Sequence, residues 1–357
     1  MDPKPYIKVL VVVVIIAVGI AGYFLTKKQN VGQEPIKIGV LSILSGDAAS
    51  WGEQAKRGAD LAIEEWRDAN PNKTLELIYE DTAAETKKTV SSFQKLVEID
   101  KVDAILGPLL QTEIAAVAPL INKYSIPVIA PSYAPVENRP DLRNPLLIWM
   151  NATKEAESIA EFVFSQGIKS VSAVGTKDAW ESEVTNAFAD RFNAIGGKVL
   201  YRELAQPDAS DVKSTWTKAL VEKPEAIFIG TYYQFINSLK ALADLGYKGK
   251  RFSIEVDNYL AGETEGTANG LQFIAPDFYT SDFATKFENR YHEKPGIPAG
   301  QAYDAANILL KFLESGEPKE AILEKMRQIK EYDGASGLIQ FTDDGKTLLP
   351  TAICRRR

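Results

Sequence analysis

The sequence contains one cysteine, Cys354, and one histidine, His292, among its 357 residues. A single cysteine excludes a disulfide within the chain and a metal site built from several thiolates. A single histidine argues against a histidine metal site and leaves a serine-type catalytic triad almost without a general base. His292 lies between Tyr291 and Glu293 and is typical of a solvated helix residue. We therefore expect no bound metal.

The sequence also lacks the short motifs of the common nucleotide-dependent enzymes and of serine hydrolases. It has no Gly-x-Gly-x-x-Gly after a strand, no phosphate loop that ends in Gly-Lys-Ser/Thr and no Gly-x-Ser-x-Gly. Adjacent acids such as Glu64 and Glu65 are more typical of a solvated surface than of an acid/base pair. These absences predict a protein without a cofactor that is not an enzyme.

An excess of basic residues is absent as well. The formal net charge is −7 and the isoelectric point is about 5.2. Proteins that bind nucleic acid need a basic face for the phosphates, so we expect no nucleic-acid partner.

One long apolar run is present, from Val9 to Leu25, with lysines on both sides. Its length is slightly below the roughly 20 residues that span a bilayer, and flanking lysines can extend it. A cleaved signal peptide is the alternative, but its small-residue sites lie inside the apolar run. We interpret 9–26 as a transmembrane anchor or signal, with 1–8 as a cytoplasmic amino terminus and 27–35 as a tether. The lysines on the two sides do not fix the orientation of such a single-pass membrane protein; the resemblance described below implies that the body is extracytoplasmic.

After residue 35, short apolar strands alternate with amphipathic helices. A first series has strands at 36–43, 75–81, 103–107 and 127–130, and a second has strands at 170–175, 198–204, 225–230 and 251–255. Such alternation predicts parallel sheets with helices on both faces. Proline-rich breaks separate the two series, which predicts two lobes rather than one continuous sheet.

The stretch from Ile36 to Trp66 begins this pattern with a strand, a Ser/Gly loop and a helix. Its sequence contains three motifs: Ile-Lys-Ile-Gly-Val-Leu-x-x-Leu-Ser-Gly, then Trp-Gly, then Gly-Ala-x-x-Leu-Ala-Ile-Glu-Glu. These motifs resemble the amino-terminal region of the branched-chain amino-acid binding proteins, the type I solute-binding proteins of ABC importers. Later matches include Gly-Pro-Leu-Leu at 107–110, Phe-Ile-Gly-Thr-Tyr-Tyr at 228–233 and Ala-Gly-Gln-Ala-Tyr-Asp-Ala at 299–305.

The resemblance implies the α/β periplasmic-binding-protein type I fold, with two lobes joined by three crossovers near 146–151, 273–277 and 334–337. It assigns 36–148 and 276–335 to lobe 1, and 149–275 and 336–353 to lobe 2. A terminal strand pair, 338–341 with 348–353, would complete lobe 2.

The resemblance also implies a ligand site in the cleft between the lobes. In the family, loop N–H and hydroxyl groups of lobe 1 hold the ligand carboxylate, and an acidic side chain of lobe 2 meets the ammonium. Glu255 matches that acid, although a solvated charge at a strand end is the alternative. Trp51 matches an aromatic residue that covers the ligand, although a core aromatic that anchors the loop is the alternative. The second lobe would add Trp180, Tyr232 and Tyr233.

The lobe 1 positions depart from the family pattern. Gln111 replaces a serine, Ser132-Tyr133-Ala134 replaces Ser-Ala-Thr, and Trp149 replaces an arginine. Because these replacements change the groups expected to hold a ligand carboxylate, the identity of the ligand stays open.

Together these features predict a solute-binding protein that delivers an amino acid or related small polar solute to the permease of an ABC transporter. The alternatives are a ligand-binding sensor domain and, less favoured because nucleophile and base are missing, an extracytoplasmic hydrolase.

Overall fold

The computed structural model describes residues 35–46, 48–134, 142, 144–256, 264, 266–276, 279–343 and 346–355. The apolar run predicted as an anchor, 9–26, lies outside this part of the chain, as does most of the tether. None of the helices in the described residues has both the length and the apolar character needed to cross a bilayer.

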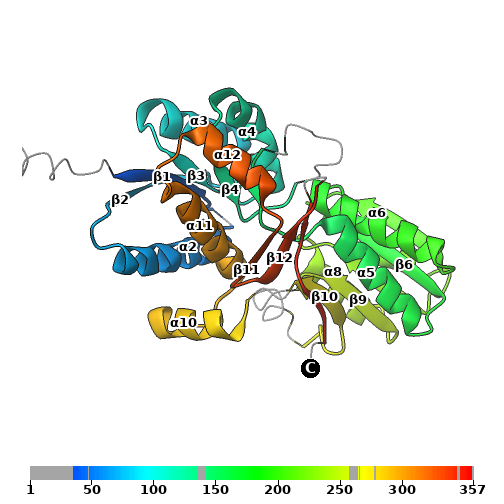
Figure 1. Cartoon of the computed structure of the whole chain (residues 1–357). Helices are drawn as coiled ribbons and strands as arrows, with labels where there is room; N and C mark the ends of the chain where they lie inside the picture. Colours follow the sequence, from blue (N-terminus) through cyan, green and yellow to red (C-terminus); the bar gives the residue numbers. More distant parts are fainter. Residues whose placement is uncertain are drawn as a thin grey trace, which may run out of the picture.

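The first lobe is built on a parallel sheet with the strand order β2-β1-β3-β4-β5. Its strands are β1 (Ile36–Ser42), β2 (Leu75–Asp81), β3 (Ala104–Leu106), β4 (Val128–Ala130) and β5 (Leu146–Leu147). The sheet is covered on both faces, by α2 (Ala49–Ala69), α11 (Ala299–Leu313) and α12 (Lys319–Gln328) on one and by α3 (Thr86–Gln94), the π-helix η1 (Lys95–Ile99) and α4 (Gln111–Tyr124) on the other (Figure 1). A further helix, α10 (Ser281–Tyr291), packs against α2.

The second lobe has its own sheet, in the order β14-β10-β9-β8-β6-β7. All neighbours are parallel except β14, which runs antiparallel to β10. The strands are β6 (Ser170–Thr176), β7 (Lys198–Ala205), β8 (Ala226–Gly230), β9 (Lys250–Ile254), β10 (Gln272–Pro276) and β14 (Thr351–Arg355). One face carries α5 (Ala152–Ser165) and α6 (Ala179–Ala194), and the other carries α7 (Val212–Ala219) and α8 (Phe235–Asp244). Two separate sheets confirm the prediction of a two-lobed α/β fold (Figure 1).

A third, small sheet departs from the prediction for the end of the chain. Its strands β11 (Glu331–Gly334), β12 (Gly337–Phe341) and β13 (Thr347–Leu348) are antiparallel. The expected strand pair in lobe 2 is therefore wrong, because only β14 joins the second sheet. The boundary expected between 335 and 336 falls inside the β11–β12 hairpin.

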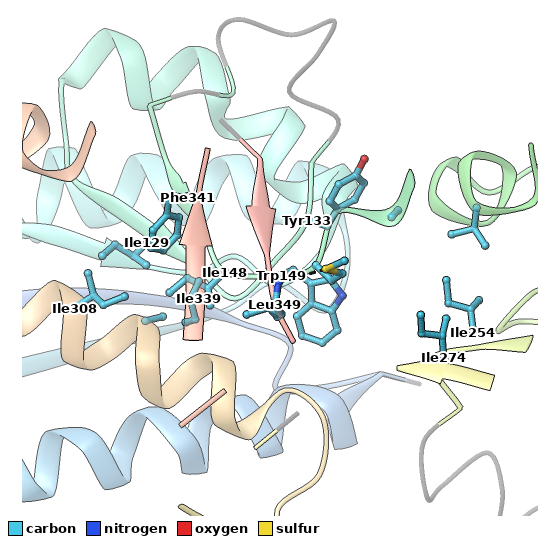
Figure 2. Packing of buried hydrophobic residues seen from close by; sticks show 14 of the residues in the cluster. Ile129, Tyr133, Ile148, Trp149, Ile254, Ile274, Ile308, Ile339, Phe341 and Leu349 are labelled. Carbon is cyan, nitrogen blue, oxygen red and sulfur yellow. Dashed lines mark hydrogen bonds between the residues drawn. The ribbon is translucent and has the colours of Figure 1, made fainter. Parts of the chain in front are cut away.

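Burial explains why β12 stays with the first lobe. Ile339 is fully buried and shares one hydrophobic cluster with Ile129 of β4 and Ile308 of α11. Figure 2 shows these side chains together with Phe341, at the junction between the lobes. The apolar positions of β12 thus complete the core of lobe 1, which alternation in the sequence alone does not reveal.

Two connections between the lobes run side by side. The backbone N–H of Asn151 donates to the carbonyl of Thr347 at 3.1 Å, and the Thr347 hydroxyl donates to the carbonyl of Leu147 at 2.5 Å. The chain therefore leaves the small sheet next to the place where it first crossed. We propose that the third crossover lies at 347–351, rather than near 334–337, with the other lobe boundaries as expected from the sequence.

Candidate ligand-binding site

Three aromatic side chains from separate segments meet where the lobes face each other. Trp51 lies in the first turn of α2, Trp149 follows β5, and Tyr232 follows β8. The centroid of the Trp51 ring is 5.7 Å from that of Trp149 and 6.4 Å from that of Tyr232. Trp51 therefore contacts both the crossover and the second lobe, which favours its expected place at the cleft over a role confined to the core of lobe 1.

Glu255 lies beside this aromatic group, directly after β9. Its side chain is buried, and the indole Nε1 of Trp149 donates a hydrogen bond to its Oε1 at 3.0 Å. Its backbone has φ +47°, while its N–H donates to the carbonyl of Ile274 at 2.8 Å. A left-handed backbone at a residue other than glycine, asparagine or aspartate is uncommon, and such strained positions concentrate at functional sites.

A second acid, Glu155, was not predicted from the sequence. It lies in the first turn of α5 and is completely buried. Burial, followed by the charge of Glu255 and a hydrogen bond to its carboxyl group, raises the pKa of Glu155 well above the ordinary value. An acid in the first turn of a helix is usually solvated and stabilises the helix dipole, so its sequence position gives no signal of burial.

The predicted residues of the loop after β4 are buried and lie at the same junction. The hydroxyl of Tyr133 donates to Oε1 of Glu183 on α6, in the opposite lobe. The hydroxyl of Ser132 donates to the carbonyl of Tyr133 at 3.3 Å, and Ala134 is buried beside them. A small pocket is lined by Tyr133, Ala134 and Trp149 together with residues of the two adjacent crossovers.

Gln111 and Trp180 occupy the amino-terminal turns of helices. Gln111 is the first residue of α4 and is half-buried. Trp180 is the second residue of α6, half-buried, and packs against the main hydrophobic cluster. The structure therefore places both residues at helix starts.

The loop that carries Tyr232 and Tyr233 is held by Glu181. This carboxylate is buried and accepts hydrogen bonds from the backbone N–H of Tyr232 at 2.6 Å and of Tyr233 at 2.9 Å. Tyr232 turns to Trp51, whereas the side chain of Tyr233 is 60 % exposed. The sequence places Glu181 where the family pattern has glycine, and its structural role could not be predicted from that difference.

Asp81 holds the first loop of lobe 1 in the same way. Its Oδ1 accepts from the backbone N–H of Leu44 at 2.9 Å, and its Oδ2 accepts from the hydroxyl of Ser45 at 2.6 Å. Although its partial burial acts in the opposite direction, the hydrogen bonds from Ser45, Lys88 and the loop hold the pKa of Asp81 below its usual range. The loop that leads to Trp51 is therefore fixed by an ionised carboxylate.

Comparison with known proteins identifies the family. The model of a family described as periplasmic binding protein matches residues 35–353. The chain belongs to this family. A curated relative, the Leu/Ile/Val-binding protein BraC3 of Rhizobium johnstonii, is 26% identical over 333 residues, which are 87% of this chain and 88% of the relative. The resemblance to the branched-chain amino-acid binding proteins is thus confirmed.

Solved structures of substrate-binding and solute-binding proteins share the fold. The substrate-binding protein LivJ from Streptococcus pneumoniae, in complex with isoleucine, has a TM-score of 0.80 at 21% identity and covers 91% of this chain and 97% of its own. A solute-binding protein from Rhodopseudomonas palustris, in complex with 3,4-dihydroxy benzoic acid, has a TM-score of 0.79 at 21% identity and covers 90% of this chain and 93% of its own. The fold therefore accommodates solutes of different chemistry.

Proposed function

We propose that this periplasmic binding protein captures an amino acid or a closely related amine in the cleft between its lobes and delivers it to the permease of an ABC transporter. The observation that carries the proposal is Glu255, a buried carboxylate in a left-handed backbone conformation beside Trp51 and Trp149. A ligand ammonium at this carboxylate would form an ion pair screened from water, and burial strengthens such a pair.

Charge favours an amine over an aromatic acid. The aromatic side chains of the site would suit a benzoate such as the one bound by the Rhodopseudomonas palustris protein. However, two acids, Glu155 and Glu255, are buried close enough here for the charge of Glu255 to act on Glu155, and the indole of Trp149 is a neutral donor to Glu255. A ligand carboxylate next to this pair would be repelled, since like charges at close range cost free energy.

Titration calorimetry on protein that has been unfolded and refolded to remove bound solute tests the proposal. We expect L-isoleucine to bind and 4-hydroxybenzoate to bind at least about 30-fold more weakly. Glu255→Gln removes the charge and keeps the acceptor for Trp149, so we expect isoleucine affinity to fall by at least about 30-fold. Glu157→Gln, a partly exposed position on the same lobe, is the matched control. Tight binding of 4-hydroxybenzoate with no response to Glu255→Gln would reject an amine ligand.

We further propose that the apolar run at 9–26 remains on the mature protein and anchors an extracytoplasmic body to the membrane. The support is the sequence alone, in which the small-residue cleavage sites lie within apolar residues. Amino-terminal sequencing of the protein from the membrane fraction measures this directly. A mature chain that begins between Ala21 and Gln33 would show cleavage instead.

A further inference from the structure

The indole N–H of Trp51 is buried and has no acceptor among the described residues. Two other tryptophans show the usual arrangement, since the indole of Trp66 donates to Glu314 and that of Trp149 donates to Glu255. A buried donor without an acceptor has lost its hydrogen bond to water and gained none from the protein, so such groups are rare in native structures. The orphaned N–H of Trp51 therefore calls for an explanation.

Trp216 shares this feature, but its surroundings differ. Its indole N–H also lacks an acceptor among the described residues, and its side chain lies fully buried in a hydrophobic cluster of the second lobe. Trp51 is only partly buried, and its ring contacts Trp149 of the crossover and Tyr232 of the second lobe. The unused donor of Trp51 thus belongs to the junction between the lobes, next to the cleft proposed for the solute.

Other donors near Trp51 already have acceptors. At the start of α2, the backbone N–H groups of Trp51 and Gly52 donate to the carbonyl of Ala48 at 3.1 Å and 3.3 Å. In the preceding loop, the hydroxyl of Ser45 donates to Asp81 at 2.6 Å. For a solute that enters beside this loop, the Trp51 indole is therefore a buried donor that is not yet in use.

The chemistry of the proposed ligand indicates which of its groups can accept this bond. Isoleucine has an ammonium group, an apolar side chain and a carboxylate, and only the carboxylate accepts hydrogen bonds. Trp149 contacts both polar partners of the site, because its ring lies 5.7 Å from that of Trp51 and its Nε1 lies 3.0 Å from Oε1 of Glu255. An α-amino acid carries its ammonium and its carboxylate on one carbon atom, so an acid and an indole donor on either side of Trp149 suit these two groups.

We propose that Trp51 binds the solute through its indole N–H, which donates a hydrogen bond to the solute carboxylate. This inference deepens the proposed function and rests on it for the ligand. Trp51 then does more than cover the solute with an apolar ring. It selects solutes that carry a carboxylate beside the ammonium group and disfavours simple amines.

Calorimetry with two matched ligands tests the proposal. The amine 2-methylbutylamine is isoleucine without its carboxylate. Trp51→Phe keeps an aromatic ring and removes the N–H, so we expect isoleucine affinity to fall at least about 10-fold and the affinity for the amine to change less than about threefold. Trp216→Phe, which removes the other unused indole N–H, is the matched control and should leave both affinities within about threefold. Equal losses for the two ligands in Trp51→Phe, or no loss for isoleucine, would overturn the proposal.

Nuclear magnetic resonance of the indole N–H groups gives a second test on the unaltered protein. The Trp51 signal can be identified by its absence from Trp51→Phe or, if that variant does not fold, by its contacts with the rings of Trp149 and Tyr232. We expect this signal to move downfield with isoleucine, as a proton does when it enters a hydrogen bond, and to stay in place with 2-methylbutylamine. The Trp216 signal should respond to neither ligand. An equal response of the Trp51 signal to both ligands would contradict the proposal.

The aromatic acid 4-hydroxybenzoate separates this inference from the proposed function, because it has a carboxylate but no ammonium group. If isoleucine does not bind while 4-hydroxybenzoate binds and moves the Trp51 signal, the donor role of Trp51 stands and the amino-acid assignment fails. If isoleucine binds and depends on Glu255 but leaves the Trp51 signal in place, the proposed function stands and this inference fails. A Trp51 signal that neither solute moves overturns the inference in every case.

Discussion

At the scale of single residues, the replacement of an arginine by Trp149 changes the charge of the cleft. An arginine at this position would pair with Glu255 and neutralise it within the protein. Trp149 instead donates one neutral N–H to Oε1 of Glu255 at 3.0 Å. Trp149 thus orients the Glu255 carboxylate without bringing a positive charge of its own, which supports the proposal of an ammonium ligand.

Glu181 orients the loop that carries Tyr232 and Tyr233, so its removal should lower both the stability of the fold and the affinity for ligand. Glu181→Ala leaves the backbone N–H groups of Tyr232 and Tyr233 without their acceptor, at about 1–3 kcal/mol for each group that stays buried. We expect a lower melting temperature and weaker isoleucine binding, measured by calorimetry. Glu181→Gln keeps an oxygen that can accept both bonds and should stay close to the unaltered protein. Equal effects of the two substitutions would show that the charge, and not the acceptor, matters.

At the scale of elements, the alternation of strands and helices was predictable because each element buries its own periodic face. The predicted strand 36–43 corresponds to β1 (Ile36–Ser42), and the predicted strand 225–230 corresponds to β8 (Ala226–Gly230). The helical segment expected between the predicted strands 75–81 and 103–107 is α3 continued by the π-helix η1. A local pattern specifies such elements without knowledge of their neighbours.

Features that depend on distant partners could not be predicted in this way. The sequence places β12 in lobe 2, away from β11, because the partners of Ile339 lie about 30 and 200 residues earlier in the chain. Glu155 was missed since its burial depends on the contact between α5 and the end of β9. The roles proposed for Trp51 and Glu255 come only from the resemblance to a family, because a tryptophan after a loop and an acid after a strand are common.

The β11–β12 hairpin is tied to α11 by Asp304, and this contact should depend on pH. The carboxyl oxygens of Asp304 accept from the N–H groups of Ala335 at 2.6 Å and Ser336 at 2.7 Å. Burial raises the pKa of Asp304 to about 6, although hydrogen bonds from Ser336 and Ala335 favour the carboxylate. The folded state therefore binds this proton more tightly than the unfolded state, where the ordinary value is 3.8.

We expect this proton to contribute fully to the free energy of unfolding below about pH 4. The contribution, about 3 kcal/mol, should be lost as the pH rises through about 6. Urea unfolding across this range measures the change, and Asp304→Asn should remove the slope. Glu331→Gln, an exposed acid on β11, should leave it in place. The same slope in Asp304→Asn would assign the effect to another group.

At the scale of the whole molecule, closure of the lobes depends on contacts across the cleft. Trp51 meets Tyr232 through their rings, and the Tyr133 hydroxyl donates to Glu183. Hinge closure of two domains about a ligand is the motion known for periplasmic binding proteins as a class. A ligand favours closure only as far as it binds the closed state better than the open one.

Tyr133→Phe should therefore weaken binding without weakening the fold. The substitution removes one hydroxyl that bridges the lobes, and a hydrogen bond to a charged group contributes about 1.5–3 kcal/mol, or roughly 10-fold or more in affinity. Thr153→Val is the matched control, because the Thr153 hydroxyl donates to the same oxygen of Glu183 at 2.8 Å but from within the second lobe. We expect isoleucine affinity to fall at least about 10-fold in Tyr133→Phe and less than about threefold in Thr153→Val, as measured by calorimetry.

Small-angle scattering without ligand should show a larger radius of gyration for Tyr133→Phe alone, since its closed state has lost a contact. If both variants lose the same affinity, Glu183 acts within its own lobe and the bond from Tyr133 does not control closure.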